Sequence, residues 1–173
     1  MEFQDAVALL HIVASLIWVA GGVATVLTGT LRKARASADE QVAQLKSLTF
    51  LGIYFFFPAM VIAVGTGLAI VMTAPDGWQP FAILGLIGVA ATLAFNALIL
   101  HPTGRRAVAI ARDRGTIAAL VELKRFSRQA KFDLALRISV VGVMMIKPDW
   151  QDYLALGGIA AILAIGALVS FAE

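Results

Sequence analysis

The chain has 173 residues, of which 60% are hydrophobic and 14% are charged, and its mean hydropathy is +0.88. Soluble domains carry roughly a quarter of their residues as charged side chains, so this composition excludes a soluble globular fold and indicates an integral membrane protein. The absence of cysteine also excludes disulfides, iron–sulfur clusters and thiolate metal sites.

Five segments are predicted to be transmembrane helices, which makes the chain an all-α bundle in a single domain, 1–173. The predicted spans are about 6–31, 48–73, 80–102, 131–147 and 152–172. The first three contain no formal charge. The fourth carries Asp133 and Arg137 one helical turn apart, a pair that in a spanning helix either faces the bundle interior or snorkels toward the interface. The count is therefore five spans, or four if this segment does not cross.

The second span has a defined start and an internal break. Ser37 and Glu40 have the spacing of a capping box, which predicts a helix that begins near Ser37 and runs into the span. Pro58 removes a backbone hydrogen bond and is expected to kink this helix. Gly65 and Gly67 then expose backbone either for a neighbouring helix or for a flat ligand.

Basic residues predict the orientation of the bundle. The segments 32–46 and 103–131 hold twelve of the fourteen Lys and Arg residues, whereas the other three connections and ends are mainly acidic. The positive-inside rule places the N-terminus outside and both basic segments in the cytoplasm. We expect a multi-pass protein of a bacterial-type inner membrane, whose first span is retained. Its basic segments face anionic lipid and not nucleic acid.

The basic cytoplasmic segment 103–130 mixes cations with regularly spaced apolar side chains. This pattern predicts one or two amphipathic helices, broken near Gly115, that lie on the inner headgroups. A protein partner or a homo-oligomer is compatible with the same pattern.

The first span has one polar and small face. Its members recur at helical spacing and are His11, Ser15, Trp18, Gly22 and Thr25. The third span has a comparable stripe of Gly85, Gly88, Thr92 and Asn96. Both faces are expected to point into the bundle.

Asn96 and Arg137 are predicted to lie at similar depth in the inner half of the bundle. The amide would there satisfy a guanidinium that is otherwise costly to bury. This contact fits either structural glue or catalysis.

His11 is the ionisable residue that most needs an explanation. It can hydrogen-bond across helices, relay protons, or ligate haem iron through one ring nitrogen. His101 lies at the other end of the membrane, roughly 20 Å away in depth, so the two histidines cannot share one metal. His101 fits an interfacial residue that caps carbonyls or touches headgroups, with a ligand role as the alternative.

A haem at His11 would either keep an open sixth position, which permits ligand or oxygen chemistry, or take its second axial ligand from methionine, because the outer half of the bundle offers no other histidine. Met144 and Met145 lie at suitable depth, with Met72 next, and ordinary filling of an apolar core is the alternative for them. Lys147 would meet a propionate, and Gly65 would let the porphyrin approach the backbone. The predicted cofactor-binding set is His11, Trp18, Gly65, Met144 and Lys147, with His11 and Met144 as the metal ligands.

The ordered motifs "LHIVASLIWVAGG", "FFFPAMVIAVGTG", "LHPTGRR" and "LRISVVGVMMIKP" resemble a family of small predicted integral membrane proteins known only as a domain of unknown function. More remotely the chain is similar to HemJ-type protoporphyrinogen oxidases and to the CopD-like copper-resistance membrane domain. The similarity runs from Leu10 to about Pro148.

The HemJ resemblance implies haem b at His11 with Trp18 beside it, and it matches Pro58, Arg137 and Lys147 to family positions. The resemblance does not imply that this chain catalyses the HemJ reaction. HemJ-type enzymes have an acidic Asn-Glu after the arginine, where this chain reads "RISV".

Two functions follow as expectations. The first is a haem b protein for electron transfer or a small membrane oxidase reaction, with a quinone or another membrane redox partner. It would be a haem-dependent oxidoreductase if it is an enzyme at all. The second is a non-enzymatic membrane subunit or accessory protein, in metal handling or transport, without a cofactor.

Overall fold

The computed structural model describes residues 3–31 and 36–171, and within these ranges every regular element is a helix. The elements are α1 (Phe3–Leu31), α2 (Ala38–Leu51), the π-helical turn η1 (Gly52–Phe56), α3 (Phe57–Thr73), α4 (Pro80–Phe95), the π-helical turn η2 (Asn96–Leu100), α5 (His101–Arg114), α6 (Leu120–Ile146) and α7 (Tyr153–Phe171).

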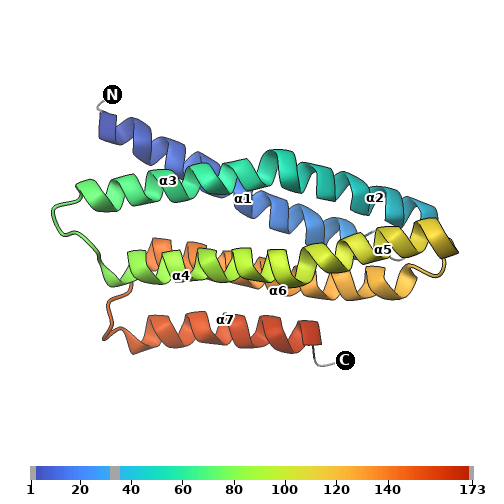
Figure 1. Ribbon diagram of the computed structural model, residues 1–173. Coiled ribbons are helices and arrows are strands. Elements are labelled where there is room, and N and C mark those ends of the chain that lie inside the picture. Colours follow the sequence, from blue (N-terminus) through green and yellow to red (C-terminus); the bar gives the residue numbers. More distant parts are fainter. Residues whose placement is uncertain (1–2, 32–35, 172–173) are drawn as a thin grey trace.

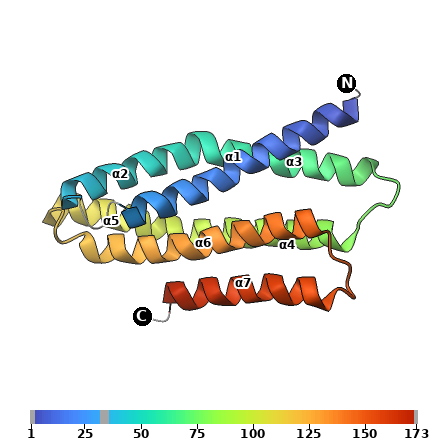
Figure 2. The ribbon, with the colours of Figure 1, turned by 180° about the vertical axis from the view of Figure 1, so that it is seen from behind.

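Consecutive elements form five long antiparallel rods (Figure 1). One rod is α2–η1–α3 and another is α4–η2–α5. The rods with α1 and α3 form one side of the bundle, α4 and α6 lie in the middle, and α7 lies on the far side in both views (Figures 1 and 2). The described parts of the two basic segments, 36–46 and 103–131, lie toward the end of the bundle that holds α5 and the start of α6, which we call the basic end. Arg32, Lys33 and Arg35 lie outside the described residues.

Four helices within the described ranges are long and apolar enough to cross a membrane: Phe3–Thr30, Ala38–Thr73, Pro80–Arg114 and Tyr153–Phe171. The helix α6 is not among them, because its apolar half also carries Lys131, Asp133 and Arg137. It is nevertheless a central helix, since it packs on α1, α4, α5 and α7.

The helix start predicted at Ser37 is confirmed. The Ser37 hydroxyl accepts a hydrogen bond from the Glu40 backbone N–H, and the Glu40 carboxylate accepts one from the Ser37 N–H. The helix then runs into the second predicted span without a break.

Each of the two π-helical turns lies directly before an X-Pro pair. The N–H of Phe57 bonds to the Gly52 carbonyl, and the N–H of His101 bonds to the Asn96 carbonyl, five residues back in each case. Pro58 and Pro102 follow and donate no hydrogen bond. The disturbance expected at Pro58 therefore takes the form of a π-turn, which adds a residue to the helix and displaces the side chains around it.

The segment 103–130 differs from the expectation in one respect. Its break at Gly115 is confirmed, because α5 ends at Arg114 and Gly115 has φ of +89°. Its two helices do not form a separate layer, however. The helix α5 continues the rod of α4, and residues 120–130 are the first turns of α6, so both helices extend the bundle lengthwise (Figure 1). They pack on each other and on α2 around Leu45, Ala107 and Leu123.

The contact between α6 and α7 depends on Gly166. A Cβ built on Gly166 would lie 2.5 Å from the Cβ of Ala135, and neither atom can move without its backbone. We expect Gly166→Ala to lower the free energy of unfolding by about 1–3 kcal/mol through overpacking. Unfolding in mixed detergent micelles, followed by circular dichroism, measures it. Gly158→Ala is the matched control on the same helix, because a Cβ there meets nothing within 4 Å and adds helix propensity. Equal effects of the two changes would contradict this packing.

Candidate functional site

A buried ion pair lies within α6. The Nε and Nη2 atoms of Arg137 each donate a hydrogen bond to the Oδ2 atom of Asp133, and both distances are 2.8 Å. The two residues are only 8% and 3% exposed. Their i,i+4 spacing puts them on one face of the helix. The pair is thus nearly enclosed by protein.

The helix α4 supplies an amide to this pair. The side-chain nitrogen of Asn96 donates to the Oδ1 atom of Asp133 and to the Thr92 carbonyl oxygen. The sequence predicted a contact from Asn96 to the Arg137 guanidinium, and in the structure the amide N–H bonds to the carboxylate instead. A guanidinium has only donors, so the donors of both residues converge on the carboxylate acceptor.

The helix α1 holds the other side of the guanidinium. The Nη1 atom of Arg137 donates to the Trp18 carbonyl oxygen at 2.6 Å, and the guanidinium carbon lies 5.2 Å from the centre of the Trp18 ring. Gly22 makes this approach feasible, because a Cβ there would lie 2.8 Å from the Arg137 Cδ. The predicted inward faces of the first and third spans are both confirmed by these contacts.

The network borders a cavity of about 530 Å³. This volume is in the range of small-molecule sites. Its walls are mostly apolar, with an aromatic part formed by Trp18, Phe56 and Phe57. Its polar lining groups come from four rods and are Thr25, Thr49, Thr92, Asn96, His101, Asp133 and Arg137.

Both π-helical turns line this cavity. Gly52, Ile53 and Phe56 of η1 lie on one wall, and Asn96, Ala97 and Leu100 of η2 lie on another. Extra turns of this kind are frequent at functional sites, because they redirect side chains without ending the helix. Ile53, Phe57 and Leu93 are substantially exposed, so the cavity is open on the side of the bundle between these two rods.

His11 does not line this cavity. Its Nδ1 atom donates to the Ala63 carbonyl oxygen at 2.8 Å and lies 3.3 Å from the Thr66 hydroxyl oxygen, both on α3. Because a carbonyl only accepts, the proton of the neutral ring is on Nδ1 and the lone pair is on Nε2. The ring edge lies against Gly67, where a Cβ would be 2.9 Å from the His11 Cε1.

The other predicted cofactor residues have separate surroundings. Met144 packs on α4, where its methyl group occupies the place that a Cβ of Gly85 would take, whereas His11 packs on α3. A Cβ on Gly65 would meet nothing within 4 Å. The Lys147 ammonium lies 5.6 Å from the centre of the Phe81 ring. Within residues 3–31 and 36–171, no three His, Cys, Asp or Glu side chains are placed to hold a metal ion.

Sequence reasoning named Arg137 and Asn96 as buried polar residues and treated Asp133 only as a charge that the fourth span has to accommodate. The cavity itself was missed. The i,i+4 spacing of Asp133 and Arg137 was the available signal for the ion pair. His101 lines the cavity, which its position in the sequence did not reveal.

Comparisons with known proteins give this chain no relative: no family model, no curated protein and no solved structure matches it. A functional proposal therefore depends on the geometry of the cavity and of the buried network.

We expect Asp133→Asn to lower the free energy of unfolding by about 3–5 kcal/mol, because it leaves the Arg137 guanidinium buried without its counter-charge. The double variant D133N/R137M removes both charges and is expected to recover much of this loss. Detergent-induced unfolding measures both. Asp76→Asn, in an exposed loop, is the control and is expected to be neutral. A double variant that is less stable than either single variant would contradict the account of an unpaired charge.

Proposed function

We propose that this protein binds a flat, lipid-soluble ligand of the quinone class in the cavity beside Arg137, as a redox protein of a bacterial-type inner membrane. The observation that carries the proposal is the cavity itself, in which aromatic and aliphatic walls converge on buried hydrogen-bonding groups. A quinone has the matching chemistry, since its ring and tail are apolar and its carbonyl oxygens accept hydrogen bonds.

Arg137 retains the donors that such carbonyl oxygens need. Its contacts with Asp133 and Trp18 use three of its five N–H groups. The His101 ring adds a group that donates or accepts. The side opening between η1 and η2 fits a ligand that arrives from the lipid phase.

The proposal includes five spans with the N-terminus outside. Support for α6 as the fifth span is that Asp133 and Arg137 neutralise each other, which lowers the cost of carrying them into the bilayer. Support for the orientation is the gathering of the described basic residues at one end of the bundle, as the positive-inside rule requires of the cytoplasmic end.

Ala97→Trp tests the proposed site. Ala97 is exposed at the side opening and lines the cavity, so an indole there is expected to block the ligand and weaken binding about tenfold or more, a cost of 1.4 kcal/mol per factor of ten. Binding of a short-tailed benzoquinone to the purified protein is followed by the quenching of tryptophan fluorescence. The part of this quenching that is lost in the variant Trp18→Phe belongs to Trp18.

The matched control is Ala94→Trp, which is exposed on the same α4–η2–α5 rod but is not part of the cavity wall. It is expected to bind as the unmodified chain does. If the unmodified protein binds no quinone, or if both tryptophan variants bind equally, the quinone proposal is wrong. The network then fits a non-enzymatic membrane subunit.

A second candidate function, haem b binding at His11, is favoured by one specific observation. The Nδ1 atom is held by the Ala63 carbonyl and the Nε2 lone pair remains, which is how proteins commonly orient an axial histidine. The fit supports a single histidine ligand. It does not support the pair with Met144, because that side chain packs on a different helix. A bound haem would supply one-electron chemistry, and His11 would hold its iron.

Absorption spectra test this second candidate. We expect protein expressed with ample haem to show a Soret band, and His11→Ala to lose it. His101→Ala is the control that keeps it. A Soret band that survives His11→Ala would refute the ligand assignment, and a complete lack of the band in the unmodified protein would refute haem binding.

A further inference from the structure

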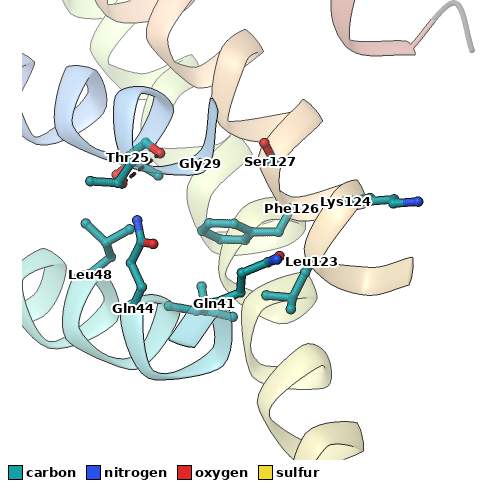
Figure 3. Close-up of a pocket in the computed structure, with 11 residues that line it drawn as sticks. Thr25, Gly29, Gln41, Gln44, Leu48, Leu123, Lys124, Phe126 and Ser127 are labelled. Atoms are coloured by element: carbon teal, nitrogen blue, oxygen red, sulfur yellow. Dashed lines mark hydrogen bonds between the residues drawn. The ribbon is translucent and has the colours of Figure 1, made fainter. Parts of the chain in front are cut away.

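A second, smaller pocket lies toward the basic end of the bundle, between α1, α2 and α6 (Figure 3). Its volume is about 50 Å³, enough for one or two water molecules. Its polar lining groups are Thr25, Thr28, Gln41, Gln44, Lys124 and Ser127. We call it the polar pocket. Its composition fits water and small polar solutes better than lipid.

The polar pocket and the large cavity share three lining residues, one from each surrounding helix: Thr25, Leu48 and Phe126. They form the neck between the two spaces. The Phe126 ring points from α6 toward Gln44 on α2 and is the largest of the three (Figure 3). On its other side it touches α5, where a Cβ on Gly104 would lie 3.3 Å from the Phe126 Cε2.

A buried polar atom lies between the neck and the ion pair along α6. The side-chain oxygen of Gln129 is buried and has no hydrogen-bond partner among the described residues. Gln129 follows Phe126 by one turn and precedes Asp133 by one turn. A buried acceptor of this kind is normally satisfied by protein or by water.

We propose that the polar pocket is the aqueous entrance to the large cavity and that Phe126 is its gate. Rotation of the ring would join the two spaces and let water and small polar solutes reach Asp133 and Asn96 from the basic end, while a lipid-soluble ligand uses the side opening. The inference rests on the two spaces and their shared neck, not on which ligand the cavity binds.

Cysteine labelling tests the gate, and the natural absence of cysteine makes every label specific. The reporter is Thr92→Cys, on the cavity wall and almost fully buried. The probe is a charged, membrane-impermeant methanethiosulfonate added to either face of sealed vesicles. We expect slow labelling from the membrane face at the basic end, and a labelling rate about tenfold or more higher when Phe126→Ala is added. If the open gate is only a minor state of the protein, the closed gate lowers the labelling rate by about this factor.

Leu123→Ala is the matched control, because Leu123 lies on the same helix and lines the polar pocket but not the cavity. It is expected to leave the labelling rate of the reporter unchanged. If Phe126→Ala does not fold, Phe126→Leu replaces it and is expected to give a smaller increase.

A labelling rate that does not respond to Phe126, or labelling from the opposite face alone, overturns the gate. This outcome is independent of quinone binding. If the protein binds quinone but shows no gating, the proposed function stands and the entrance is refuted. If it shows gating but binds no quinone, the entrance stands and the proposed function is refuted.

Discussion

The constraint on which this structure depends is the burial of Arg137 and Asp133 among apolar helices. An isolated charge in such surroundings is very costly, and even a paired one needs further hydrogen bonds to its remaining atoms. Here α1 contributes the Trp18 carbonyl, and α4 contributes the Asn96 amide. Because each contact has to be made at one depth, to a backbone carbonyl of α1 and to a side-chain amide of the α4–η2–α5 rod, the pair fixes the register of α6 against two other rods. The small residues along those rods then allow the close approach.

The two π-turns connect this network to a binding space. Pro58 and Pro102 each deprive the helix of one N–H, and the chain accommodates each by one wider turn just before the proline. Both turns face the same cavity, beside the same ion pair. Two local backbone features, far apart in sequence, thus shape one site. The cavity has two distinct sides as a result: an apolar opening between the rods, and the narrow polar neck at Phe126.

The two histidines are separated by this arrangement. His11 packs on α3, where its Nδ1 atom is bound to the Ala63 carbonyl, whereas His101 lines the cavity near the basic end. The quinone proposal uses the second region and the haem candidate uses the first. Their tests are independent for that reason, and a redox protein with a cofactor in each region is consistent with both.

Much of the fold could be predicted from the sequence because hydropathy, helical periodicity and capping are local. The apolar segments, the start at Ser37, the break at Gly115 and the inward faces of the first and third spans all follow from residues close together in the chain. The candidate site could not be predicted in the same way. Which donor meets Asp133, which helix holds His11 and whether a space remains beside Arg137 depend on how rods distant in sequence pack. Hydropathy indicates that a residue is buried, but only the tertiary structure decides its partner, because many pairings bury the same apolar surface.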